Sequence, residues 1–290
     1  MKISGFTIIK NAVSNDYPIV EAIQSILPVV DEMIVLVGDS TDDTIALIES
    51  IGDAKIKIHH SVWDASLRSG GTVLADETNK AFALIDPSSD WAFYIQGDEV
   101  IQEKYHETIK TACTQYASDK KVDGLLFKYL HFYGTYNYVG DSRRWYNHEV
   151  RIIRNDKTIS AYKDAQGFRR GEAKLLVKPI DAFVYHYGWV KSPQQMMKKQ
   201  KEVSRFWHGD EVLKTHTAIP DYFDYTAFDS LEKFMGNHPL VMQPRIARIN
   251  WDVEIDPSQK KLSLKDRLLY YFEKATGIRL FDFRNYRIIR

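Results

Sequence analysis

Four short apolar segments alternate with helix-length segments over the first 95 residues, and this alternation limits the possible fold more than any other feature. The apolar segments are residues 3–10, 33–37, 55–60 and 91–95. Helix signals lie between them; Pro18, for example, fits the first position of a helix that reaches Leu27. Strands that alternate with helices through short connections build a mostly parallel sheet with helices on both faces. We therefore predict an α/β fold of this kind.

The second half of the chain predicts a different arrangement, a mixed or antiparallel sheet followed by a helical C-terminal extension. The expected elements are a strand at 122–133, a loop at 134–147, strands at 149–154, 174–177 and 182–187, and helices at 192–207 and 264–276. The last helix is amphipathic and Gly277 closes it. The predicted domains are 1–210, with halves 1–110 and 111–210, and an extension over 211–290.

Composition excludes several classes of protein. Lys plus Arg and Asp plus Glu are equal at 39 each, so no basic surplus indicates a nucleic-acid partner. The single cysteine, Cys113, excludes an internal disulfide framework. No run of 18 apolar residues and no signal-peptide pattern is seen. We expect a soluble, cytoplasmic protein.

The strand at 91–95 ends abruptly at Gln96-Gly97-Asp98-Glu99. In open α/β sheets ligands bind at the carboxyl ends of the strands. A carboxylate there suits a hard divalent cation that holds a phosphate-bearing substrate. The alternative is a solvated turn that caps the following helix, since acidic residues favour helix N-termini.

Several segments, in this order and spacing, resemble glycosyltransferase family 2. They are Phe6–Asn11, Ile34–Val37, Asp39–Thr44 and Asp90–Glu99, with weaker likeness in Glu149–Asn155, Asp164–Phe168 and Tyr185–Gly188. The resemblance implies the GT-A fold, a nucleotide-diphosphate sugar donor, inversion at the transferred sugar, and Mn²⁺ or Mg²⁺. It weakens after residue 110 and ends near residue 210.

The family's metal motif, Asp-x-Asp, corresponds to Gln96-Gly97-Asp98 in this chain. The resemblance makes Asp98 a metal ligand and places Gln96 and Gly97 against the donor; the amide of Gln96 can accept from a ribose hydroxyl but carries no charge. A second metal ligand is expected from a downstream histidine, and His186 fits. Taken alone, His186 is better interpreted as a hydrogen-bonded core histidine, and Asp98 reverses that preference.

Other donor contacts follow from the same resemblance. The family's base-binding acids are replaced by Val37-Gly38, so Asp39 is expected to contact the base from a shifted position, with Asn11 nearby. Arg68 is the expected diphosphate contact, and Lys191 and Lys198 are weaker candidates. For each of these three cations the alternative is a plain surface charge.

Inverting transfer needs a carboxylate base that deprotonates the acceptor hydroxyl. The family places it before the metal-binding histidine, where the chain offers Asp141, Glu149, Asp164 and Glu172. Asp164 is the first choice and Glu172 the second; the alternative for Asp164 is a turn-forming aspartate. Aromatic side chains that could stack on sugars or pack in the core are Trp63, Tyr94, His131, Tyr133, Trp145, Tyr146 and Trp189.

The sequence thus predicts a metal-dependent, inverting, hexosyltransferase-type enzyme (EC 2.4) that acts on a glycan or lipid-linked acceptor in cell-surface polysaccharide or lipopolysaccharide synthesis. The basic C-terminal helix and tail could touch an anionic membrane, or the helix could simply pack on the domain. Two alternatives remain. One is a scaffold without activity that binds glycan or nucleotide sugar, since Gln96 departs from the metal motif. The other is a sugar nucleotidyltransferase, although residues 10–15 lack its glycine-rich basic loop.

Overall fold

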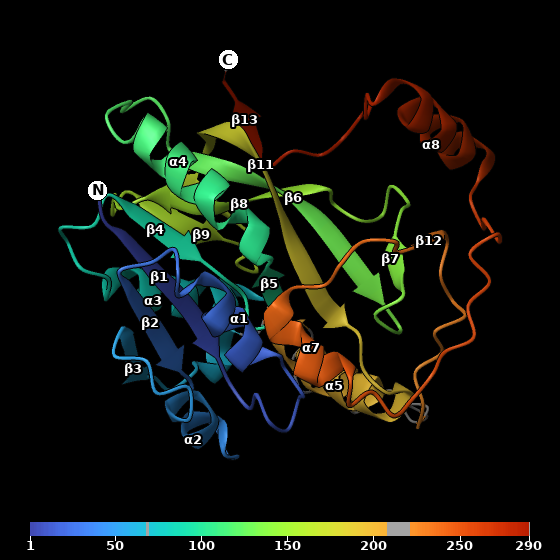
Figure 1. Ribbon diagram of the computed structural model, residues 1–290, viewed down its shortest axis with the longest axis horizontal. Helices are drawn as coiled ribbons and strands as arrows, with labels where there is room; N and C mark the ends of the chain where they lie inside the picture. Colours follow the sequence, from blue (N-terminus) through green and yellow to red (C-terminus); the bar gives the residue numbers. More distant parts are fainter. Residues whose placement is uncertain (68–69, 208–220, 290) are drawn as a thin grey trace.

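The computed structural model describes residues 1–67, 70–207 and 221–289. A single curved sheet dominates the fold (Figure 1). Its first half is made of β1 (Ile3–Ile9), β2 (Glu32–Val37), β3 (Ile56–His60) and β4 (Trp91–Tyr94). These four strands are parallel, in the order β3-β2-β1-β4. The predicted parallel first half is therefore confirmed.

Alternate residues of β1, β2 and β4 enter two separate cores. Ile3, Val35 and Phe93 belong to the core on one face, and Phe6 and Ile34 belong to the core on the other face. This is the two-residue period of an extended chain, here apolar on both sides because both faces are covered.

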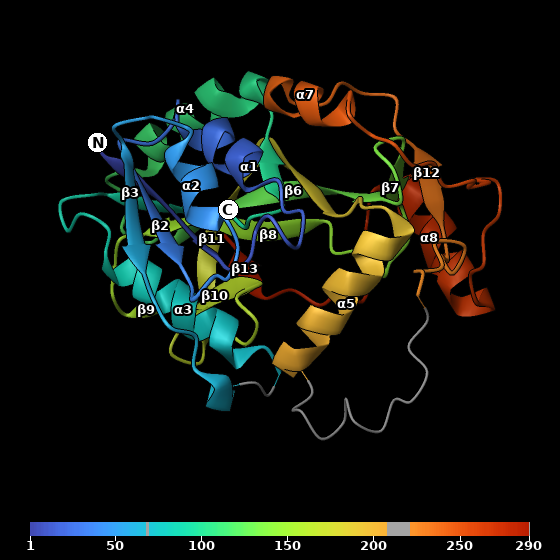
Figure 2. The same ribbon diagram turned by 90° about the horizontal axis from the view of Figure 1, so that it is seen from below.

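Helices cover both faces, as predicted. The helices of this half are α1 (Ile19–Ile26), α2 (Thr44–Glu49), α3 (Thr72–Ala83) and α4 (His106–Tyr116), with short 3₁₀ turns at Ala65–Leu67 and Glu103–Tyr105. Buried residues of α1, α2 and α4 join the first core, whereas those of α3 join the second. Figure 2 shows α1 and α4 above the sheet and α3 below it.

The second half of the sheet is mixed, which confirms the remaining part of the fold prediction. The strands are β5 (Glu99–Ile101), β6 (Gly124–Tyr133), β7 (Tyr138–Gly140), β8 (His148–Arg154), β9 (Ile159–Tyr162), β10 (Gly167–Arg170) and β11 (Ala173–Trp189). β8 runs antiparallel to β4 and β6, while β11 runs parallel to β6 and antiparallel to β10.

Several details differ from the prediction, and β9 and β10 are strands that the sequence did not predict. The two strands expected at 174–177 and 182–187 are one strand, β11, whose pairing with β6 is irregular between Pro179 and Phe183. Proline cannot donate to the ladder, which explains why the sequence pattern breaks inside a continuous strand. The predicted loop at 134–147 contains β7, and residues 99–101 form the unpredicted strand β5.

The described part of the C-terminal region packs against β7 and β11 and adds two strands. Its elements are β12 (Leu231–Lys233), a 3₁₀ turn at Leu240–Met242, α7 (Gln243–Ile246), α8 (Leu264–Thr276) and β13 (Tyr286–Ile288). β13 pairs with β11, and β12 pairs with β7. α8 begins after Ser263, whose hydroxyl accepts from the Asp266 N–H, and ends at left-handed Gly277, as the sequence predicted. α5 (Pro193–Trp207) also has its predicted bounds.

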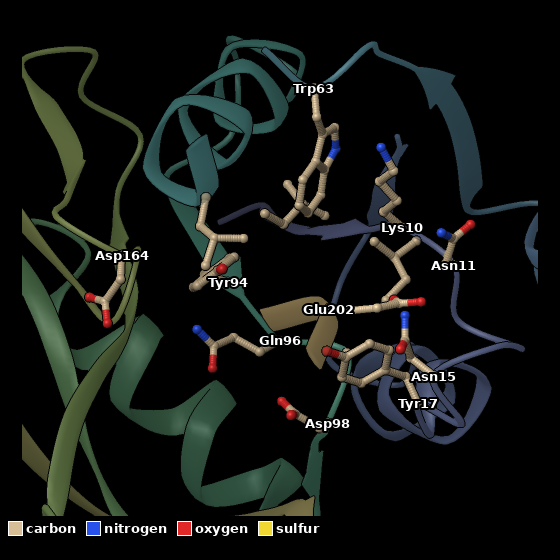
Figure 3. A pocket seen from close by; sticks show the side chains of 14 residues that line it. Lys10, Asn11, Asn15, Tyr17, Trp63, Tyr94, Gln96, Asp98, Asp164 and Glu202 are labelled. Carbon is tan, nitrogen blue, oxygen red and sulfur yellow. The ribbon is translucent and has the colours of Figure 1, made fainter. Parts of the chain in front are cut away.

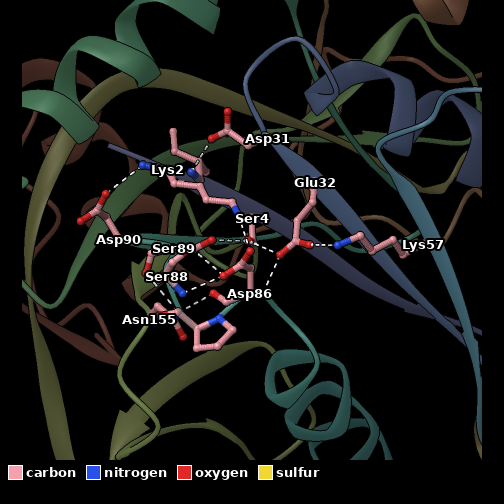
Figure 4. A network of polar contacts seen from close by, with 12 residues as sticks. Lys2, Ser4, Asp31, Glu32, Lys57, Asp86, Ser88, Ser89, Asp90 and Asn155 are labelled. Carbon is pink, nitrogen blue, oxygen red and sulfur yellow. Dashed lines mark hydrogen bonds and ion pairs between the residues drawn. The ribbon is translucent and has the colours of Figure 1, made fainter.

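The amino ends of β1 and β2 carry a closed polar network (Figure 4). The carboxylate of Glu32 accepts hydrogen bonds of 2.6 Å from Ser4 Oγ, from Lys57 Nζ and from the Asp86 N–H. Ser4 also bonds Ser89, in the loop before β4. Each group is thus satisfied by another from a neighbouring element, which ties three strands together at this end.

Among the residues described, none of the helices combines the length and apolar character needed to cross a bilayer.

Candidate active site

A pocket of about 310 Å³ opens at the carboxyl ends of β1 and β4, the opposite end of the sheet from the Glu32 network (Figure 3). Its polar lining consists of Lys10, Asn11, Asn15, Tyr17, Trp63, Tyr94, Gln96, Asp98, Asp164 and Glu202. The pocket therefore lies where the parallel strands predict a ligand site.

Strand pairing brings His186 to Asp98 from 88 positions away in the sequence. β5 pairs antiparallel with β11, with His186 opposite Glu99, and the Tyr187 N–H donates to the Asp98 carbonyl at 2.8 Å. As a result His186 Nε2 lies 3.8 Å from Asp98 Oδ2. The two residues that the resemblance names as metal ligands are thus neighbours; Asp98 lines the pocket, and His186 lies beside Asp98 but is not part of the pocket lining.

Gly188 leaves open the space between these two side chains. A Cβ atom at this position would lie 2.6 Å from Asp98 Oδ2 and 2.7 Å from His186 Nε2. Any larger residue would therefore occupy the gap in which the carboxylate and the imidazole converge.

Lys199 of α5 is the cation nearest to Asp98. Its Nζ lies 3.1 Å from Asp98 Oδ2 and donates to the Gly188 carbonyl at 2.9 Å. From the sequence, Lys198 and Lys191 were the lysines expected to contact the diphosphate. Lys198 is exposed, whereas Lys191 is buried and donates to the Asp16 carbonyl. The helical period turns Lys199 inward, and this could be recognised only once the face of α5 that meets the sheet was known.

These neighbours set the charges at the site. Burial alone would raise the pKa of Asp98, but Lys199 and His186 outweigh it and hold the pKa at about 2. Burial lowers the pKa of His186, although Asp98 opposes the shift. Burial also lowers the pKa of Lys191, to about 7, with a contribution from nearby Lys199. At neutral pH the site thus presents an ionised carboxylate beside a neutral imidazole.

Glu99, the second acid of the motif, has a structural role. Both of its carboxylate oxygens accept from Arg151 at 2.8 Å, and the Tyr129 hydroxyl donates to it at 2.7 Å. Glu99 and Arg151 are both fully buried. The buried partner of Arg151 is thus Glu99, 52 positions away in the sequence. This bidentate ion pair anchors the turn that presents Asp98.

Gln96, Gly97 and Asp164 all line the pocket. Gln96 donates its backbone N–H to Glu99 at 3.1 Å, and its amide points into the pocket between Asp98 and Asp164 (Figure 3). Asp164 lies in the turn between β9 and β10, flanked by Lys163 and Ala165, which both have left-handed backbone conformations. Such strain costs about 1 kcal/mol or more per residue and tends to occur at functional sites.

The other predicted donor contacts are more scattered. Asn11 lines the pocket, and its side-chain oxygen accepts from the Thr41 N–H at 2.8 Å. Asp39 is not among the lining residues, but it contacts two of them: it forms an ion pair with Lys10 at 2.7 Å and accepts from the Trp63 N–H at 3.1 Å. Arg68 falls outside the described residues.

Glu172, the second candidate for the base, is exposed at the turn between β10 and β11 and is not part of the pocket lining. Of the aromatic residues named from the sequence, Trp63 and Tyr94 line the pocket. The others pack together behind His186, around Trp145 and Tyr133.

The residues present fit a divalent cation whose remaining ligands come from a substrate. Within the described ranges, no three His, Cys, Asp or Glu side chains come together as a metal-binding group. Asp98 and His186 supply two ligand atoms 3.8 Å apart, with the gap at Gly188 beside them. A cation held by one or two protein ligands and substrate phosphates is the usual arrangement for Mg²⁺, and imidazole with carboxylate also suits Mn²⁺.

Two curated relatives match part of the chain. Over 119 residues it is 32% identical to an uncharacterized glycosyltransferase of Rickettsia felis and 31% identical to one of Rickettsia conorii. Each match covers 41% of this chain, and the chain spans only 36% of the length of each relative. A solved structure of S. aureus TarS (residues 1–349) in complex with UDP-GlcNAc covers 74% of this chain and 69% of that chain, at 18% identity and a TM-score of 0.43.

No family model matches the chain. The names of the two relatives do not include family 2. They do confirm, over the matched 119 residues, the resemblance to glycosyltransferases that the sequence motifs indicated.

Proposed function

We propose that this protein is a glycosyltransferase of the GT-A type that takes its sugar from a nucleotide-diphosphate donor. The observation that carries the proposal is the convergence of Asp98 and His186 at a pocket formed by the carboxyl ends of parallel strands. The likeness to two proteins named glycosyltransferases supports it.

In this proposal the donor diphosphate lies near Asp98, His186 and Lys199. A bound Mn²⁺ or Mg²⁺ would act as a Lewis acid and neutralise charge on the leaving diphosphate. Lys199 places a second positive charge beside the same carboxylate. Gln96, Gly97 and Asn11 would contact the nucleoside, with Lys10 in the pocket lining and Asp39 paired with it.

Asp164 is the proposed base. It lines the pocket. Among the described residues, its carboxylate accepts one hydrogen bond, a long one of 3.4 Å from the Gln166 N–H. An acceptor hydroxyl that loses its proton to Asp164 would attack the sugar carbon while the diphosphate leaves from the opposite face, which inverts that centre. Glu172 does not line the pocket and has no role in this mechanism.

We extend the proposal to the acceptor, a glycan or a lipid-linked sugar of the kind used in cell-surface polysaccharide or lipopolysaccharide synthesis. α8 supports a contact with a membrane surface. Its Leu264, Leu268, Tyr271 and Phe272 are exposed and share one face, at spacings of four, three and one residues. The following segment exposes Phe281 and Phe283 beside Arg284. Such a surface suits the interface of a membrane with anionic lipids.

The membrane part of the proposal is tested by flotation with vesicles. Binding to vesicles that contain phosphatidylglycerol, absent with pure phosphatidylcholine and lost in a Leu268→Glu, Phe281→Ser variant, is expected. Equal recovery of the variant and the wild type with the vesicles would remove the membrane contact and leave the transferase proposal unchanged.

A scaffold that binds nucleotide sugar without transferring it remains the second candidate. Two observations favour it: Gln96 brings no charge to the motif, and Lys199 already neutralises Asp98. A scaffold would bind the nucleotide sugar but would neither release nor transfer the sugar, whereas the transferase would do both.

Calorimetric titration of UDP, GDP and CDP, each with and without Mn²⁺, tests the proposal. One nucleotide is expected to bind in a metal-dependent manner, and Asp98→Ala is expected to abolish that binding. Binding of no nucleotide under either condition would contradict the proposed site. Binding without hydrolysis or transfer of the matching nucleotide sugars would favour the scaffold.

A further inference from the structure

A chain of contacts leads from a backbone carbonyl through two histidines to Asp98. The Tyr146 carbonyl oxygen lies 2.8 Å from His131 Nε2, and His131 Nδ1 lies 3.1 Å from His186 Nδ1. His186 Nε2 in turn faces Asp98 Oδ2 at 3.8 Å. The two histidines are register partners on the paired strands β6 and β11, so the sheet fixes how closely their rings approach.

The carbonyl at one end of this chain determines which nitrogen of each ring carries a proton. A carbonyl oxygen only accepts, so His131 Nε2 must donate. A neutral His131 then carries a lone pair on Nδ1, and the 3.1 Å contact requires His186 Nδ1 to donate. Nε2 of a neutral His186 is therefore left with its lone pair on the side of Asp98.

The surroundings of His131 favour the neutral ring in a fixed orientation. The side chain is 2% exposed, and the rings of Tyr129 and Trp145 stack against it with centroids at 5.4 and 5.2 Å. The Tyr146 ring meets its edge at 4.4 Å. Burial among these rings fixes the orientation of the imidazole and disfavours a charge on it.

We propose that His131 is a positioning residue that holds His186 in the tautomer with its proton on Nδ1, so that His186 Nε2 can bind a divalent cation together with Asp98. The cation is part of the proposed function, and the inference rests on it in that respect. Without His131, Asp98 becomes the nearest acceptor for His186, and a proton on Nε2 would remove the lone pair that a metal needs. Partners that fix a ligating histidine in this way typically contribute 10–100-fold to metal affinity.

The first measurement is made on the metal-free protein. Nitrogen-15 NMR of the histidine rings at neutral pH, assigned with a His186→Asn variant, reports which nitrogen of His186 is protonated. A protonated Nδ1 and an unprotonated Nε2 are expected. A wild-type His186 with its proton on Nε2 would overturn the inference, and this readout needs no variant of His131, no metal and no activity.

The second measurement compares the affinity for Mn²⁺ among three variants. His131→Phe keeps a ring but removes both polar atoms, so the proton of His186 should move to Nε2 and the Kd for Mn²⁺ should rise about 10–100-fold. His131→Gln can donate to the Tyr146 carbonyl and accept from His186, so it should restore most of the affinity. Trp145→Phe is the matched control, since it retains an aromatic ring against His131 and should leave the tautomer and the Kd close to the wild type.

The outcomes separate this inference from the proposed function. A His131→Phe variant that keeps both the tautomer and the Mn²⁺ affinity of the wild type would overturn the role of His131. A wild type that binds no Mn²⁺ would overturn the metal-binding part of the proposed function, while the tautomer measured without metal would still decide whether His131 positions His186.

Discussion

The two ends of the parallel strands each bury an acidic side chain, and the two acids have opposite surroundings. At the amino ends, Glu32 is 4% exposed and accepts three hydrogen bonds of 2.6 Å from neighbouring elements. At the carboxyl ends, Asp98 is 9% exposed, lines a pocket and meets Lys199 and His186. One acid closes a network within the protein, and the other faces a space that a ligand can enter.

The two ends of the sheet therefore have different roles: the contacts at the amino ends add stability, and those at the carboxyl ends form the candidate site. Groups that satisfy one another across β1 and β2 add to the free energy of unfolding. Groups that converge on a pocket are arranged for something that binds there, and they lower the stability that the same residues could otherwise give. Substitutions at the two ends should therefore have effects of different kinds.

The largest effect is expected from Asp98→Asn, which keeps the shape of the side chain but removes its charge. Loss of metal-assisted stabilisation of the leaving diphosphate should lower kcat/KM at least about 10³-fold. Transfer assays with the sugar donor of the nucleotide found by calorimetry measure this. An Asp98→Asn enzyme with near wild-type activity and unchanged metal dependence would contradict the proposed site.

Asp164→Asn is expected to lower kcat about 10²–10⁴-fold, the usual contribution of a general base. The affinity for the nucleotide should stay unchanged because the base acts on the acceptor. Glu172→Gln is the matched control: its carboxylate is exposed outside the pocket, so both kcat and nucleotide affinity should match the wild type. A large loss in the control but not in Asp164→Asn would exchange the two assignments.

Gly188→Ala tests the gap between Asp98 and His186. Its methyl group would lie 2.6–2.7 Å from their ligand atoms, and overpacking of this kind costs about 1–3 kcal/mol. Metal-dependent nucleotide binding should weaken by about tenfold or more, as measured by calorimetry. Metal-independent binding should change little, and an unaltered response to Mn²⁺ would show that the cation binds elsewhere.

The smallest effect is expected at the amino ends, where Glu32→Gln should lower the free energy of unfolding by about 1–3 kcal/mol. Nucleotide affinity should not change. Burial alone would raise the pKa of Glu32, but hydrogen bonds from Lys57, Ser4 and Asp86 outweigh it, so its pKa is lower folded than unfolded. Its contribution is therefore present above the ordinary glutamate pKa of about 4.3 and is lost as the pH falls through the lower folded value.

Urea unfolding at pH 7 and at pH 3 measures this pH dependence. The wild type should lose more stability than Glu32→Gln on acidification, so the difference between them should shrink. A difference that stays the same at both pH values would show that the charge of Glu32 is not what stabilises this end of the sheet.

Much of the fold could be predicted from the sequence because local patterns determined it. The positions of β1, β2 and β4 follow from apolar runs that are buried on both faces of the sheet. α8 has the predicted bounds and ends at Gly277 as predicted, since caps act within a few residues. β11 was divided in two because Pro179 interrupts the pattern, although the strand continues past it.

The candidate site likewise depends partly on local sequence and partly on contacts between residues far apart in the sequence. The sequence alone shows that Gln96-Gly97-Asp98 follows the end of β4, because an apolar run followed by polar residues marks the end of a buried strand. Which residues contact Asp98 depends on the tertiary structure. The pairing of β5 with β11 brought His186 to it, the orientation of α5 turned Lys199 toward it, and Arg151 took Glu99 away from the site. These contacts join residues 52 to 101 positions apart, and no local pattern records them because packing, not sequence spacing, sets their distances.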